Sequence, residues 1–126
     1  MSFKSELLQA IHDFSSDVFK LALYDSDASL SSATTAYSTT NEVSGSGYSA
    51  GGATLTAGTV TTSGQKVYVT FDDETFSTVT ISPVGGLIYN SSKADRAVAV
   101  LSFGTARTKT AADLVINFPD ELIRIE

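Results

Sequence analysis

The chain has 126 residues, a formal net charge of −6, one His, and neither Cys nor Trp. The acidic balance argues against binding to nucleic-acid phosphates, and the lack of Cys excludes disulfides and thiolate metal sites. No apolar run approaches the roughly 20 residues of a membrane-spanning helix, and the N-terminus lacks the apolar segment of a signal peptide. We therefore expect one soluble domain made in the cytosol, with no nucleic-acid partner and no membrane association.

The first 16 residues are predicted to form an N-terminal segment that precedes a single β-sandwich domain over residues 17–126. Four apolar side chains of this segment recur at helical spacing: Phe3, Leu7, Leu8 and Ile11. This pattern predicts a short helix over about residues 3–13, with a strand as the alternative. Because the apolar stripe needs a partner, we expect the segment to serve as a contact arm.

The first predicted strand, Asp17–Tyr24, alternates between two faces, and a long loop over residues 25–52 follows it. The loop is rich in Ser, Thr and Gly and has few large side chains. Tyr37 and Tyr48 are expected to anchor it onto the body of the domain. Because loops carry binding residues on a rigid framework, we also expect partner contacts here.

Strand patterns then recur at intervals of about 8–12 residues, as in sandwiches and barrels. Thr, of which the chain has 16, and aromatic and branched residues favour sheet here. The predicted strands are Ala53–Thr62, Gln65–Asp72, Phe76–Ser82, Val84–Tyr89, Arg96–Phe103, Asp113–Phe118 and Leu122–Glu126. With about eight strands in all, we expect an antiparallel, jelly-roll-like β-sandwich.

The predicted strand Arg96–Phe103 is apolar on both faces, which indicates a central strand or one that faces a partner. Val98 and Val100 share one of these faces and are candidate contact residues. Together with the apolar C-terminal segment 122–125, this strand predicts a homo-oligomer, with a trimer favoured.

A match to a catalytic motif occurs at Gly47-Tyr-Ser-Ala-Gly51, which fits the G-x-S-x-G nucleophile elbow. That elbow works only on a sharp strand-to-helix turn, with an acid and then a histidine later in the chain. The one histidine, His12, precedes the motif, and no helix is predicted after Gly51. We therefore interpret Ser49 as part of a glycine-rich loop and His12 as a partly buried polar side chain, and we assign no catalytic residue.

Two further polar motifs are interpreted as incidental. Asp72-Asp73-Glu74 offers carboxylate oxygens of the kind that Ca²⁺ prefers, but three consecutive acids do not by themselves converge on one point. A solvated hairpin end is expected there, with a Ca²⁺ site as the alternative. Asn90-Ser-Ser92 is a glycosylation sequon, which has no meaning without a signal peptide. The sequence thus predicts no metal and no cofactor.

Seven segments, which cover most of the chain in order, carry a resemblance to a known family: Phe19–Tyr24, Thr35–Tyr37, Thr40–Tyr48, Ala50–Gly52, Gly86–Asn90, Arg96–Gly104 and Ile123–Ile125. The family comprises small structural proteins of tailed bacteriophages. The resemblance implies a virion component that is repeated many times on a particle, and it implies no reaction.

The expected function is therefore that of a non-enzymatic virion protein, which decorates the capsid and bridges subunits of the major capsid protein. A tail, collar or fibre-associated component is the first alternative. A carbohydrate-binding adhesion module is the second, since tyrosines can stack on sugars. A hydrolase ranks last.

Overall fold

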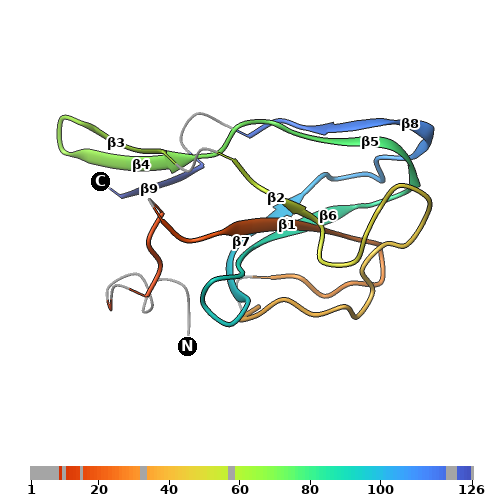
Figure 1. The fold of residues 1–126 in the computed structure, drawn as a ribbon, viewed down its shortest axis with the longest axis horizontal. Coiled ribbons are helices and arrows are strands. Elements are labelled where there is room, and N and C mark those ends of the chain that lie inside the picture. Colours follow the sequence, from red (N-terminus) through yellow and green to blue (C-terminus); the bar gives the residue numbers. More distant parts are fainter. Residues whose placement is uncertain are drawn as a thin grey trace.

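The computed structural model describes residues 9, 11–14, 16–31, 34–56, 59–118 and 122–125, and nine strands occur among them (Figure 1). The strands are β1 (Phe19–Tyr24), β2 (Ala53–Thr54), β3 (Thr59–Ser63), β4 (Lys66–Thr70), β5 (Glu74–Ile81), β6 (Gly85–Asn90), β7 (Arg96–Ser102), β8 (Lys109–Ile116) and β9 (Ile123–Ile125). All the strand pairs are antiparallel, and the described residues include no helix. The predicted antiparallel all-β, sandwich-like fold is confirmed. The strand order does not establish the jelly-roll topology.

One layer of the molecule is a four-stranded sheet with the order β2-β1-β6-β7. β1 and β6 lie at its centre and pair along their full lengths. As the alternation predicted, Leu21 and Leu23 pack into one apolar cluster, whereas Ala22 and Tyr24 pack into another. Successive side chains of a strand point to opposite faces, so the sheet is covered on both sides.

The other layer is built from two sheets, β3-β4-β9 and β5-β8. They lie end to end, because the same two stretches of chain form paired strands in both sheets. β4 continues into β5 and β8 continues towards β9, so residues 66–81 run antiparallel to residues 109–125. The main chain leaves this pairing at residues 71–73, where the amide of Phe118 donates to the carboxylate of Asp73 at 3.2 Å. The end that carries β3, β4 and β9 projects past the four-stranded sheet (Figure 1).

The main core lies between the two layers. Its fully buried members include Leu21, Leu23 and Ile88 from the first layer, and Val79 and Leu114 from the second. A row of aromatic rings extends it towards the projecting end, and its ring centroids are separated by 4.7, 5.6 and 6.1 Å. In order, the rings are Phe14, Phe19, Phe71 and Phe118.

The outer face of the four-stranded sheet is covered by the loop of residues 25–52. Ala28, Leu30 and Tyr37 from this loop pack on a second apolar cluster that includes Tyr24 and Tyr89. The rings of Tyr37 and Tyr89 stack with their centroids 4.6 Å apart. Because this face is covered, β1 and β6 can carry apolar side chains on both faces without exposing them to water.

The strand β7 differs from the expectation of a central position, because it lies at the edge of its sheet. A bulge explains its two apolar faces. Ile88 pairs with Ala99 but Tyr89 pairs with Ala97, so Val98 is the extra residue. The bulge changes the phase of the side chains: Ala97 packs in the outer cluster, while Val98 joins the main core with 8% of its surface exposed.

Two other expectations about single elements need correction. The predicted strand Ala53–Thr62 is two strands in different layers, because Leu55 is buried between them and its amide donates to the carbonyl of Phe19 at 2.8 Å. Of the predicted helix, residues 3–8 and 10 lie outside the described residues, and residues 11–13 are not helical. Tertiary contacts shape this stretch, since His12 is buried against Asn90.

Candidate contact surface

The two layers are joined along one side by the loop and the chain that follows it. Along the edge of β1, Tyr24 pairs with Glu42, and β2 pairs with residues 20 and 21. Across the gap, the amide of Thr80 on β5 donates to the carbonyl of Ser46 at 3.0 Å. The main-chain groups along this side are thus engaged, and we call it the closed side.

The opposite side, which we call the open side, is formed by the edges of β7 and β8. On this side the loop reaches only the start of β7, where Ala36 pairs with Arg96. Within the described ranges, residues 99–102 pair only with β6, and β8 pairs only with β5. An edge of this kind presents unpaired N–H and C=O groups that can receive another strand.

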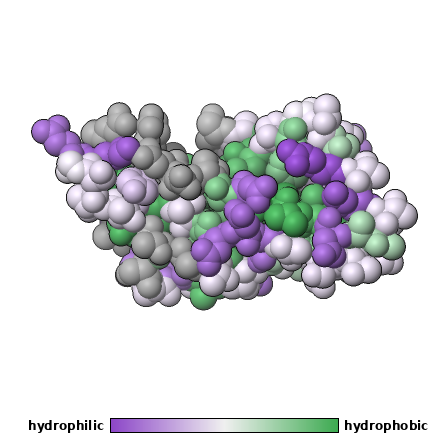
Figure 2. Space-filling view, turned by 90° about the horizontal axis from the view of Figure 1, so that it is seen from above, coloured by the Kyte–Doolittle hydropathy of each residue, from purple (hydrophilic) through white to green (hydrophobic). Residues whose placement is uncertain are grey.

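A groove of about 330 Å³ lies on the open side. It is lined by five apolar and three polar residues: Val100, Leu101, Ser102, Phe103, Arg107, Val115, Ile116 and Asn117. Two of these residues are exposed valines, with 37% of Val100 and 44% of Val115 accessible to solvent. Apolar surface also shows among polar side chains in Figure 2, which looks onto the layer that contains β5 and β8.

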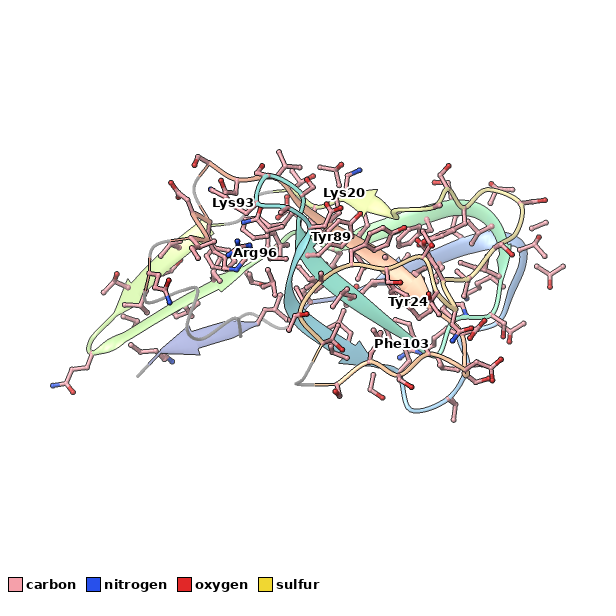
Figure 3. The ribbon with its side chains drawn as sticks, turned by 90° about the horizontal axis from the view of Figure 1, so that it is seen from below. Lys20, Tyr24, Tyr89, Lys93, Arg96 and Phe103 are labelled. Carbon is pink, nitrogen blue, oxygen red and sulfur yellow. The ribbon has the colours of Figure 1, made fainter. Side chains whose placement is uncertain are left out.

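Arg107 is the charged residue of the groove. Its guanidinium carbon lies 5.3 Å from the ring centroid of Phe103, which follows the end of β7 (Figure 3). Its amide donates to the carbonyl of Pro83 at 2.8 Å, so the main chain holds it in place. No acidic residue lines the groove, and no acid among the described residues pairs with the Arg107 side chain.

The loop of residues 25–52 is held by a hydrogen-bond network centred on the carboxylate of Glu42. This carboxylate accepts bonds from the hydroxyls of Tyr37 and Tyr48 and, at 2.8 Å, from the amide of Gly51. The hydroxyls of Tyr24 and Tyr89 donate to loop carbonyls instead. Figure 3 looks onto this face of the sheet, with Tyr24 and Tyr89 labelled.

The same network keeps its tyrosines neutral well above neutral pH. Burial raises the pKa of Tyr24 and of Tyr89 to about 12. Burial also raises the pKa of Tyr37 and Tyr48, and hydrogen bonding to the Glu42 carboxylate raises both further. A phenol that must donate to a carboxylate cannot ionise without losing that bond.

The structure places the predicted contact residues in very different environments. Phe3, Leu7 and Leu8 lie outside the described residues, and Ile11 is half-buried. Tyr37 and Tyr48 anchor the loop as predicted, through ring contacts with Tyr89 and Phe76. Val98 is packed in the core and leaves little surface for a partner, whereas Val100 lines the open groove.

Three residues that matter here were not singled out from the sequence: Glu42, Arg107 and Val115. Glu42 is the only acid among residues 28–71, in a stretch that also holds three of the five tyrosines. Val115 stands on the face of its strand opposite to Leu114 and Ile116, where a polar residue is usual. Arg107 gave no local signal, because its role depends on the position of Phe103.

The polar motifs do not form a catalytic or metal site among the described residues. Ser49 is exposed and the chain after Gly51 enters a strand, so the helix that a nucleophile elbow needs does not follow. Asp72 and Asp73 are exposed. Within the described part of the chain, no group of three His, Cys, Asp or Glu side chains is arranged to hold a metal ion.

His12 belongs to a polar cluster that ties the N-terminal segment to the turn after β6. The side-chain nitrogen of the fully buried Asn90 lies 3.0 Å from Nδ1 of His12 and donates to Asp17 at 2.8 Å. Lys93 also bonds Asp17, at 2.8 Å. Burial raises the pKa of Asp17, but the bonds from Lys93 and Asn90 outweigh it and hold the pKa below its ordinary value. Since Asn90 is buried, the sequon at this position is inaccessible.

Comparison with known proteins gave no relative from which a function could be transferred. No family model, curated protein or solved structure matches the chain. The part of the chain that the structure describes has no helix of the length and apolarity needed to cross a membrane.

Proposed function

We propose that this protein is a non-enzymatic structural subunit of a phage particle, which decorates the capsid by binding shell subunits through its open side. The observation that carries the proposal is the groove between β7 and β8, with Val100 and Val115 exposed at its rim. Unpaired strand edges with apolar side chains beside them can receive a strand of another chain. The resemblance of the sequence to structural proteins of tailed bacteriophages supports the proposal that the particle is a phage.

The architecture suits a subunit that is repeated on a shell. The closed side and the packed loop fix the framework, so that the open side is held in one geometry before a partner arrives. Little conformational entropy is then lost on binding, which favours affinity. Many copies that each bind modestly can together reinforce a shell, because contacts within one particle act at high effective concentration.

The first test is the copy number of the protein in purified particles of the phage that encodes it. Quantitative mass spectrometry should find copies on the order of hundreds, as the symmetry of a shell requires. About 3 to 12 copies would assign the protein to the tail, collar or fibres instead, since those parts have low closed symmetry. Absence from the particles would contradict the proposal altogether.

The second test is the stability of particles that lack the protein. Deletion of its gene should leave particles that release DNA at a lower temperature, and addition of the purified protein should restore resistance. The Ser49→Ala variant serves as a control, because Ser49 is exposed and lies outside the groove. It should restore resistance as well as the wild type does. If the wild type restores resistance and Ser49→Ala does not, Ser49 takes part in a reaction and the proposed non-enzymatic function is wrong.

The carbohydrate-binding alternative has less support from the structure. Four of the five tyrosines use their hydroxyls within the fold, and the Tyr37 ring is stacked on Tyr89. Side chains fixed in this way are poorly placed to form a stacking platform for a sugar ring.

A further inference from the structure

The strand edges on the open side can form main-chain hydrogen bonds with an extended segment of another chain. Residues 99–102 of β7 and the strand β8 each pair on one side only, within the described ranges. The groove runs between these two edges, from residues 100–103 to residues 115–117. A segment placed there can bond to main-chain groups of either edge, which is recognition by strand addition.

The lining of the groove sets which side chains such a segment must carry. Leu101 and Phe103 are partly buried against the main core, and Ile116 is 4% exposed. A strand points alternate side chains to the same face, so the occupant needs apolar residues at every second position. These side chains would pack on Leu101, Phe103 and Ile116, and the main chain of the segment would lie alongside Val100 and Val115.

The charge of the groove restricts the occupant further. Arg107 is the charged residue in the lining of a site that belongs to a chain of net charge −6. Its planar guanidinium is suited to pair with a carboxylate through two parallel hydrogen bonds. Since no described acid already pairs with it, this donor set is available to a partner.

We propose that the groove binds an extended segment of the shell protein, with alternating apolar side chains and one Asp or Glu that pairs with Arg107. This inference rests on the proposed function and specifies the partner segment. A second copy of the same chain is the less suitable occupant. The projecting β3–β4 hairpin, which exposes Val60 and Val67, carries Lys66 and no acid, so it offers Arg107 no carboxylate.

The test uses overlapping fluorescein-labelled peptides that tile the shell protein of the same particle, with binding measured by fluorescence anisotropy. We expect at least one acidic, alternating peptide to bind, and replacement of its acid by Lys to weaken binding about tenfold or more. The Arg107→Glu variant should reverse this preference and bind the Lys peptide better. Hydrogen exchange should show new protection in β7 or β8 when the peptide is bound.

Matched lysine substitutions locate the binding site. Val115→Lys should abolish peptide binding, whereas Val60→Lys should leave it unchanged, because Val60 is similarly exposed at 51% but lies on β3. Circular dichroism should show that both variants keep the fold. Equal binding by both variants, or a peptide preference unaffected by Arg107→Glu, would overturn the assignment.

Two further outcomes separate this inference from the proposed function. If the protein is present on particles but no shell peptide binds, the inference is wrong and the proposed function stands. If Val115→Lys changes only the sedimentation of the protein alone, from an oligomer to a monomer, a second copy occupies the groove and the shell segment is excluded. Absence from the particles removes the proposed function itself.

Discussion

At the scale of single residues, glycine is required where the loop approaches the strands. Gly52 has a φ of +79°, and a Cβ at this position would overlap the carbonyl oxygen of Leu21. A Cβ at Gly45 or Gly47 would likewise overlap the carbonyl oxygen of Thr80 or Thr78. The glycine-rich composition of the loop is therefore explained by close packing of backbones, and the serine within it needs no catalytic explanation.

We expect Gly52→Ala to destabilise the protein by about 2–4 kcal/mol, because it adds a backbone clash to the strain of a positive φ. Gly104→Ala is the matched control: its φ is +78°, but a Cβ there has nothing within 4 Å. That substitution should cost only about 1 kcal/mol. Urea unfolding followed by circular dichroism measures both. Equal effects would mean that the loop does not pack on Leu21.

At the scale of elements, the long loop acts as a cover for the outer face of the sheet. Its apolar residues are few, yet Leu30 and Tyr37 are enough to complete the outer cluster. Glu42 gathers the loop by binding donors from both of its halves. The fold itself therefore holds residues 34–52 in place.

We expect Glu42→Gln to destabilise the protein by about 1–3 kcal/mol, since a neutral amide cannot accept the same set of bonds and leaves a donor unpaired. Hydrogen exchange should rise throughout residues 34–52. Glu74→Gln is the control, because among the described residues the Glu74 carboxylate accepts a bond only from the neighbouring amide of Thr75. Its exchange pattern should match that of the wild type. A Glu42→Gln variant with unchanged exchange would show that the apolar contacts alone hold the loop.

At the scale of the whole molecule, the sandwich has one closed and one open side. On the closed side, the loop and β2 pair with the edge of β1. On the open side, the outer edges of β7 and β8 have no strand partner among the described residues. Under the proposed function, this asymmetry would direct partner binding to the open side. The packing of the loop on the four-stranded sheet also depends on the outer cluster, whose tyrosines are neutral in the folded protein.

We expect stability to be lost at alkaline pH. The folded pKa values of Tyr24 and Tyr89, about 12, exceed the ordinary value of 10.0, and those of Tyr37 and Tyr48 are raised as well. A raised folded pKa means that the stabilisation is fully present below pH 10 and is lost as pH rises towards 12. Absorbance at 295 nm and circular dichroism, recorded together from pH 9 to 12.5, should show tyrosinate forming as structure disappears. Ionisation of most tyrosines near pH 10 in a folded protein would contradict the network.

The sequence was enough to predict most strands, because alternation along each strand reflects burial on that strand alone. It also predicted that Tyr37 and Tyr48 anchor the loop, since large aromatic side chains in a polar segment have few other uses. The prediction of a single strand over Ala53–Thr62 was wrong, because composition does not show where the chain passes from one layer to the other. Of the two alternatives for Arg96–Phe103, the central position was wrong, because a one-residue bulge makes an edge strand apolar on both faces. That the strand faces a partner stays a prediction.

By itself, then, the sequence determined the all-β class and the two-faced packing of β1, which follow from local periodicity. Only the tertiary structure decided that Val98 is buried in the core while Val100 is exposed. It also decided that the Glu42 carboxylate accepts hydrogen bonds from two tyrosine hydroxyls, and that Arg107 lies over Phe103 in a groove that Val115 also lines. These features join residues from different strands and layers. Long-range pairing determines which edges meet and which stay open, and no pattern within a single segment encodes it.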